Sequence, residues 1–159
     1  MNKLTHIDKS NKPRMVDIGG KKITSRSAHA RTYIILPKEL MSLFSDGEIK
    51  TPKGPVFNTA IVAGVMAAKK THEFIPFCHP ISLENCDISI ELDGDKKLVI
   101  DCICKIKSRT GVEMEALTGV SMAALVVYDM CKALSHDISI GPTQLISKHG
   151  GKRDFIRDE

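Results

Sequence analysis

Two side chains of opposite charge lie three positions apart near the end of a long apolar segment. Asp129 and Lys132 fall within residues 111–134, where apolar and small residues predominate. On a helix, positions i and i+3 are neighbours on the surface, so a carboxylate and an ammonium group there can move protons on one substrate. Apolar neighbours predict a partly buried flank, where an unpartnered charge is costly. A solvated salt bridge with no catalytic task is the competing interpretation.

A lysine in a loop of glycine and proline is the second candidate. Lys53 lies just before another apolar stretch, which runs through about residue 71. If that stretch is a helix, its free N–H groups favour an anion, and the ammonium group adds to the attraction. A lysine in such a loop can equally be solvated and bind nothing.

A cysteine and a histidine stand between two prolines. Pro76 and Pro80 fix the backbone on either side of Cys78-His79, which predicts a stiff loop. Metal binding and a thiolate nucleophile are both conceivable, but no other cysteine or histidine stands at a standard ligand spacing. The favoured functional interpretation is a rigid loop that presents His79 to an anion. A packed loop histidine is the alternative.

Further basic residues fall on a predicted strand and at the end of the chain. Arg26 and Arg31 punctuate a segment rich in β-branched residues, and residues 148–153 form a basic, glycine-rich tail that begins with Lys148. The arginines are either solvent-facing charges or anion contacts. The tail is either a frayed terminus or a flexible phosphate clasp.

Two long helices are expected to position these groups. Residues 111–134 predict one, with Glu113 and Glu115 in the first turn, where acids favour the positive helix end. The stretch that ends near residue 71 predicts the other, with small residues over much of its surface. The remaining non-strand expectations are an extended arm over residues 1–20, a short helix over 37–43 and a polar loop over 45–51.

Four strands are expected, over residues 22–36, 82–92, 97–107 and 138–146. The middle two are joined at an Asp-Gly turn, and Gly141-Pro142 interrupts the last. The order strand, helix, strand, strand, helix, strand predicts a ferredoxin-like βαββαβ fold of the α+β class, with two long helices packed on one face of an antiparallel sheet. We expect a single domain over residues 1–159, with a flexible basic tail over 148–159.

Composition narrows the functional classes. The 159 residues include 23 lysines and arginines against 19 acids, a net charge of +4, which suits a small anionic ligand better than extended nucleic acid. The five cysteines form no Cys-x-x-Cys pair, and residues 1–10 contain no apolar run typical of a signal peptide. We therefore expect a cytoplasmic protein with reduced thiols and no membrane contact.

Several unusual motifs together resemble one family. They are Lys53-Gly-x-Val56-Phe57, Ile75-Pro-x-Cys78-His79-Pro80, Gly111-Val-Glu-Met-Glu-Ala-Leu117, Tyr128-Asp-Met-Cys-Lys132 and Ile140-Gly-Pro142. The chain resembles the MoaC family of molybdenum cofactor biosynthesis, the cyclic pyranopterin monophosphate synthases. Leu4-Thr-His-Ile7 and Met15-Val-Asp17 extend the resemblance over nearly the whole sequence.

The resemblance implies an enzyme, a lyase. Members of this family rearrange a cyclised dihydroguanosine triphosphate, 3',8-cyclo-7,8-dihydro-GTP, to cyclic pyranopterin monophosphate and release diphosphate. Opening a purine ring and closing a pyran ring move protons between nitrogen, carbon and oxygen, which suits a carboxylate beside an ammonium group. Lys, Arg and His aimed at the phosphates would stabilise charge on the departing diphosphate.

The resemblance also implies a site and an assembly. Carried over to matching positions, the catalytic residues are Asp129, Lys132 and Lys53, and the substrate-binding residues are Phe77, Cys78, His79, Glu113, Met114, Glu115, Arg26 and Lys148. Cys78 is expected to pack or position rather than to act as a nucleophile. The family forms homohexamers, trimers of dimers, with active sites at subunit boundaries. No resident cofactor or metal site is implied, although magnesium can accompany the triphosphate.

Two other functions compete with this interpretation. RNA recognition domains share the ferredoxin-like order, but they stack bases on aromatic residues of the central strands, and residues 97–107 contain none. A noncatalytic, oligomeric nucleotide-binding protein would use the same lysines and histidine to hold phosphates. Release of diphosphate from the cyclised substrate separates that possibility from an enzyme.

Overall fold

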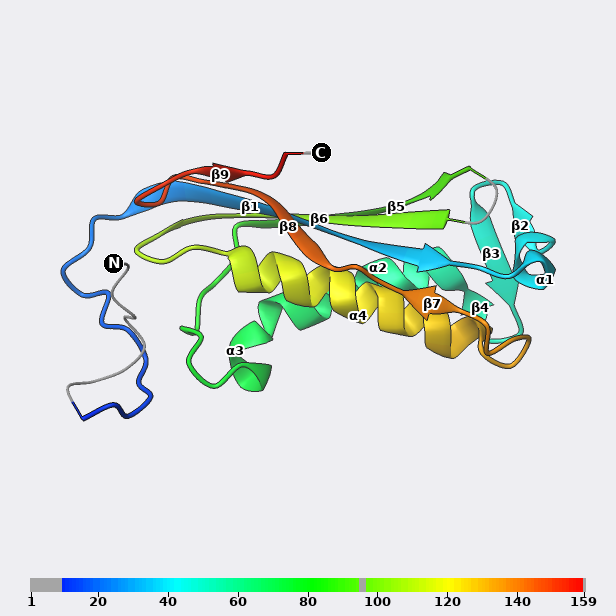
Figure 1. Cartoon of the computed structure of the whole chain (residues 1–159), viewed down its shortest axis with the longest axis horizontal. Coiled ribbons are helices and arrows are strands. Elements are labelled where there is room, and N and C mark those ends of the chain that lie inside the picture. Colours follow the sequence, from blue (N-terminus) through cyan, green and yellow to red (C-terminus); the bar gives the residue numbers. More distant parts are fainter. Residues whose placement is uncertain (1–9, 95–96, 159) are drawn as a thin grey trace.

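The central feature is an antiparallel sheet in the computed structural model, which describes residues 10–94 and 97–158 (Figure 1). Its main strands follow the order β5-β6-β1-β8-β9, and β7 pairs with β1 beside β8. The bounds are β1 Thr24–Ile35, β5 Asn85–Asp93, β6 Lys97–Ser108, β7 Ser139–Ile140, β8 Gln144–His149 and β9 Phe155–Ile156. The β5-β6-β1-β8 order and its antiparallel pairings confirm the predicted ferredoxin-like fold.

Two long helices cover one face of this sheet, as predicted (Figure 1). They are α2, Val56–Lys69, and α4, Glu113–Cys131. One apolar face of α4 enters the core, where Val120, Ala124 and Val127 are fully buried. Among the described helices, α4 is the one long and apolar enough to cross a membrane, but half of that stretch is buried in the protein, as expected of a core helix.

Small residues allow α2 and α4 to pack closely. A Cβ atom placed on Gly64 of α2 would lie 2.8 Å from the backbone oxygen of Gly119 on α4 and 2.6 Å from the Ile88 Cδ1 atom of β5. These separations are shorter than van der Waals contact. The glycine therefore sets the distance between the helices and the sheet.

The predicted polar loop over residues 45–51 is wrong, because much of it is strand. A separate sheet contains β2 Phe44–Ser45, β3 Glu48–Thr51 and β4 Gly54–Pro55. The segment is mostly polar, but it contains Ile49, which is fully buried. Asp46 and Gly47 turn the chain with φ angles of 52° and 75°. The short helix predicted before this segment is confirmed as α1, Lys38–Met41, and a further turn, α3, Thr71–Phe74, follows α2.

The C-terminal segment also differs from expectation. Residues 148–149 belong to β8, and the chain then reverses so that β9 pairs with β8. The predicted frayed or flexible tail is thus a short hairpin at the edge of the main sheet, closed near Gly150, whose φ angle is +83°. The predicted N-terminal arm contains no helix or long strand from residue 10 to its end at residue 20; its earlier part lies outside the described residues.

Candidate active site

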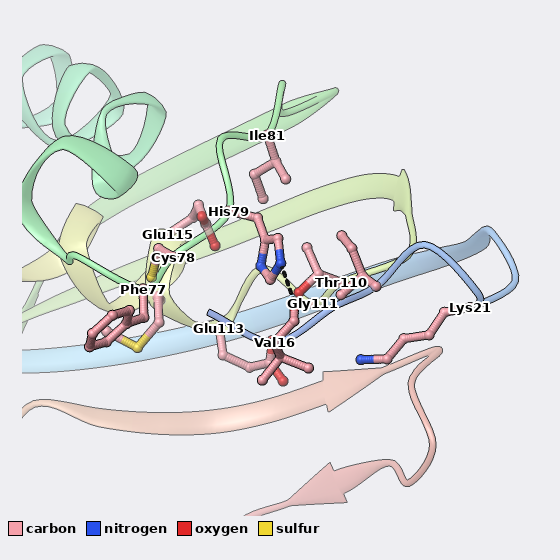
Figure 2. Close-up of a pocket in the computed structure, with 12 residues that line it drawn as sticks. Val16, Lys21, Phe77, Cys78, His79, Ile81, Thr110, Gly111, Glu113 and Glu115 are labelled. Carbon is pink, nitrogen blue, oxygen red and sulfur yellow. Dashed lines mark hydrogen bonds between the residues drawn. The ribbon is translucent and has the colours of Figure 1, made fainter. Parts of the chain in front are cut away.

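A cavity of about 360 Å³ lies at the N-terminal end of α4 (Figure 2). Three segments form it: the arm, the loop after α3, and the entry to α4. Its lining residues are Val16, Ile18, Lys21, Phe77, Cys78, His79, Ile81, Thr110, Gly111, Glu113, Met114 and Glu115. The rigid loop predicted around Cys78-His79 and the first turn of α4 are therefore brought together.

His79 holds the arm against this cavity. Its Nε2 atom donates a hydrogen bond to the backbone oxygen of Val16 at 2.7 Å, the dashed contact in Figure 2. A carbonyl oxygen can only accept, so the bond fixes which ring nitrogen carries the proton. One ring nitrogen of His79 is thus engaged by the protein itself, while the ring still lines the cavity.

Glu115 is the group in the cavity best suited to proton transfer near neutral pH. Its side chain is buried, with 4% of the residue exposed. Burial is the main reason that the pKa of Glu115 is raised to about 7; a backbone hydrogen bond opposes the shift, and the nearby negative charge of Glu113 contributes to it. An acid with a pKa near the working pH can both donate and accept a proton.

Cys78 lies beside Glu115 in the same cavity (Figure 2). Burial raises the pKa of the Cys78 thiol, and the negative charge of Glu115 adds to the effect. Because the thiolate is the nucleophilic form, this environment disfavours covalent catalysis by Cys78.

A second cavity, of about 200 Å³, adjoins the first through Gly111 and Glu113. It is lined by Arg26, Ser27, Gly111, Glu113, Lys148, His149, Gly151 and Lys152. The Lys148 Nζ atom lies 2.9 Å from Glu113 Oε1, and Arg26 Nε donates to the backbone oxygen of Ser108 at 3.0 Å. We call these two cavities together the α4 N-terminal site. Its second half is rich in cations, as a phosphate site requires.

A separate charged cluster lies at the other end of α4. Asp129 Oδ1 is 2.7 Å from Lys132 Nζ, and Asp129 Oδ2 is 2.9 Å from Lys53 Nζ. The side chains of Lys132, Lys53 and Asp129 are 46%, 51% and 55% exposed, so the expectation of a partly buried flank is wrong for the isolated chain. Hydrogen bonds from Lys132 and then Lys53 lower the pKa of Asp129 to about 2. We call these three residues the Asp129 cluster.

The α2 N-terminus does not offer Lys53 an anion site of the kind expected. The N–H groups of Phe57 and Asn58 already donate to the Glu48 carboxylate, at 2.8 and 3.2 Å. Lys53 instead reaches across to α4, where its Nζ atom also donates to the backbone oxygen of Asp129 at 3.0 Å. Glu48 thus binds free N–H groups at the start of α2, and Lys53 pairs with the Asp129 carboxylate.

Comparison with known proteins identifies the family of the chain. A model of the MoaC family matches residues 15–151. The chain belongs to the MoaC family.

The similarity to individual MoaC proteins extends over nearly the full length. The cyclic pyranopterin monophosphate synthase of Xanthomonas oryzae pv. oryzae (strain MAFF 311018) is 52% identical over 153 residues, 96% of this chain and 93% of the relative. The same-named protein of Xanthomonas axonopodis pv. citri (strain 306) is 50% identical over the same shares. Molybdenum cofactor biosynthesis protein 1 of Dictyostelium discoideum is 47% identical over 168 residues, 95% of this chain but 27% of that longer protein.

In this MoaC protein the predicted site residues fall into two groups rather than one. Phe77, Cys78, His79, Glu113, Met114, Glu115, Arg26 and Lys148 line the α4 N-terminal site. Asp129, Lys132 and Lys53 form the cluster at the opposite end of the helix. Glu113 and Asp129 are sixteen positions apart on α4, which is about 24 Å along the axis at 1.5 Å per residue. One chain does not bring the groups together.

Several lining residues were not found from sequence. Lys21 and Ile18 enter the first cavity from the arm, and Lys152, which belongs to the basic tail but was not selected individually, lines the second. The Gly19-Gly20-Lys21 turn was the one signal for Lys21. Arg31, a candidate anion contact, instead pairs with Asp101 at 2.8 Å, beside a contact between Asp101 and His29.

Proposed function

We propose that this chain converts 3',8-cyclo-7,8-dihydro-GTP to cyclic pyranopterin monophosphate and releases diphosphate, an early step of molybdenum cofactor biosynthesis. The observation that carries the proposal is the identity of about half of all positions, over 96% of the chain, with proteins named for that synthase activity. The composition of the α4 N-terminal site supports it, because proton-transfer and phosphate-binding groups occur side by side there.

The two halves of the α4 N-terminal site suit different parts of the substrate. Glu115, with a pKa of about 7, lies in the larger cavity, where the rearranging ring system would bind. Arg26, Lys148 and Lys152 line the smaller cavity, where they would neutralise the phosphates and the departing diphosphate. Magnesium would enter with the triphosphate as part of the substrate complex.

The catalytic site is completed between subunits. The Asp129 cluster is half exposed and about 24 Å along α4 from Glu113, so a neighbouring chain must supply it to a substrate held at the α4 N-terminal site. Apolar side chains of α2 and α4 provide a surface for association, because Val62, Met66 and Leu125 are 59%, 57% and 55% exposed. We propose a homohexamer, a trimer of dimers, that acts in the cytoplasm.

The decisive experiment is turnover of the cyclised GTP intermediate by the purified chain. We expect equimolar diphosphate and cyclic pyranopterin monophosphate, with no turnover of GTP itself. Binding of the intermediate without diphosphate release would favour the noncatalytic nucleotide-binding alternative. Light scattering at micromolar concentration tests the assembly: a particle of one 17.5 kDa chain would contradict the shared site.

A further inference from the structure

Three cysteines form a compact triangle between the sheet and the helices, away from the α4 N-terminal site. The Sγ atoms of Cys86 and Cys102 are 3.8 Å apart, those of Cys102 and Cys104 are 3.7 Å apart, and those of Cys104 and Cys86 are 3.8 Å apart. Cys86 of β5 pairs in register with Cys104 of β6, and Cys102 lies two residues earlier on the same face. Their arrangement follows from the strand pairing.

This triangle has the dimensions of an all-sulfur metal site. The centre of a triangle with edges of 3.7–3.8 Å lies about 2.2 Å from each corner, close to the metal–sulfur bond of about 2.3 Å that zinc makes. An ion in the plane of the three sulfur atoms would need no movement of the backbone. All three sulfur atoms lie within 4.8 Å of one another, close enough to bind one metal ion together.

The described surroundings supply three protein ligands. Cys102 and Cys104 are fully buried, and α4 approaches so closely that a Cβ atom on Gly119 would lie 2.9 Å from Cys102 Sγ. Among the described residues, the cluster includes no histidine, aspartate or glutamate as a fourth ligand. A structural zinc site almost always has four ligands, whereas soft thiolates also select Cu(I).

The chemistry of the cluster suits a soft cation. Metal binding to cysteine releases the thiol protons, because the thiolate is the ligand. Cys102 and Cys104 are fully buried, so the negative charge formed on coordination would be costly there unless a bound cation offset it.

We propose that Cys86, Cys102 and Cys104 form a three-coordinate binding site for one thiophilic metal ion of the Cu(I) type. The site is separate from the proposed synthase chemistry. Its occupation would join the edge strand β5 to β6 beneath α4 and strengthen that side of the sheet.

The test is an anaerobic titration of the full-length protein with tetrakis(acetonitrile)copper(I) in competition with the chelator bicinchoninate. We expect the wild type to take one Cu(I) per chain from the chelator. Cys86→Ala removes the half-buried ligand and should weaken binding by at least about 100-fold, since changing a residue that only supports a ligand already costs about 10–100-fold. Cys131→Ala is the matched control, because Cys131 is a buried thiol of α4 outside the cluster, and it should bind as the wild type does.

X-ray absorption at the copper edge provides a measurement that needs no variant. The wild-type complex should show three sulfur ligands at about 2.2–2.3 Å and no nitrogen ligand. Failure of the wild type to compete with the chelator would overturn the proposal and leave a ring of hydrogen-bonded thiols in the core. Nitrogen ligation, unchanged affinity in folded Cys86→Ala, or equal loss in Cys131→Ala would overturn it as well. If Cys86→Ala does not fold, the wild-type stoichiometry and absorption spectrum decide.

Discussion

Mixing two inactive variants should restore activity if the catalytic site is shared between chains. Asp129→Asn removes the carboxylate of the Asp129 cluster, and Glu115→Gln removes the titrating acid of the α4 N-terminal site; both keep the size of the side chain. Each variant alone should lose at least about 100-fold in turnover, the lower end of what one positioned proton-transfer group contributes. Both should remain folded, since the exposed Asp129 pairs contribute little to stability and the Glu115→Gln amide replaces a carboxyl that is largely neutral below pH 7.

The expected recovery follows from the geometry. Because about 24 Å of helix separates the two groups, a shared site would take Glu115 from one chain and Asp129 from its neighbour. In an assembly formed from equal amounts of the two variants, a given site receives each intact group with a chance of one half. About one quarter of the sites should then be intact, and co-expressed chains should show about a quarter of wild-type turnover.

A matched control uses wild-type chains mixed equally with the Asp129→Asn, Glu115→Gln double variant. Shared sites predict about a quarter of wild-type turnover, whereas sites contained within one chain predict about a half. Mass spectrometry of differently tagged chains must show that they have assembled together. No recovery in such mixed assemblies, or near-normal turnover by folded Asp129→Asn alone, would refute the shared site.

Three further predictions concern stability and the roles of single residues. The pKa of Glu115 is about 7 in the folded chain and near 4.5 when unfolded, so the contribution of this group to the free energy of unfolding should be fully present below pH 4.5 and fall by about 3 kcal/mol as the pH rises through 7. Thermal melts from pH 4.5 to 8 should show that Glu115→Gln loses less stability than the wild type. Parallel curves for the two proteins would contradict the assignment. Gly64→Ala should lower the free energy of unfolding by about 1–3 kcal/mol in denaturant titrations, because the added Cβ atom would clash with Gly119 and Ile88. Gly20→Ala, where the Cβ atom enters open space, should have little effect. Equal denaturation midpoints for the two variants would refute the packing argument. Cys78→Ser should keep measurable turnover and His79→Ala should mainly raise KM, so complete inactivation of folded Cys78→Ser would restore the thiol as a catalytic candidate.

The regular elements could be predicted because their signals are local. The alternating strands β5 and β6, their Asp-Gly connection and the apolar face of α4 follow from period and turn chemistry. The hairpin of β2 and β3 was missed because Ile49 is the one buried apolar residue in its second strand, too little to reveal the pairing.

The candidate site was only partly predictable from sequence. The motifs identified the residues of the site, but the length of α4 decides which of them lie close together. Glu113 and Asp129 lie toward opposite ends of that helix. Lys21 and Lys152 reach the cavities through the path of the arm and the C-terminal hairpin, which depends on distant contacts such as the His79 bond to Val16. No residue pattern near Lys21 or Lys152 encodes those contacts.

The hairpin that carries Lys53 determines where the chain can change length. Thr51 closes the turn between β3 and β4, since its hydroxyl bonds the backbone oxygen of Gly54 at 3.3 Å and accepts from the Lys53 backbone at 3.2 Å. Glu48 ties the base of the same hairpin to α2. An inserted residue at the exposed Asp46-Gly47 turn would leave these anchors in place, whereas one inserted between Thr51 and Pro55 would move the Lys53 ammonium group away from Asp129. The first turn can therefore accept an added residue in this chain, while the second must keep its residue count.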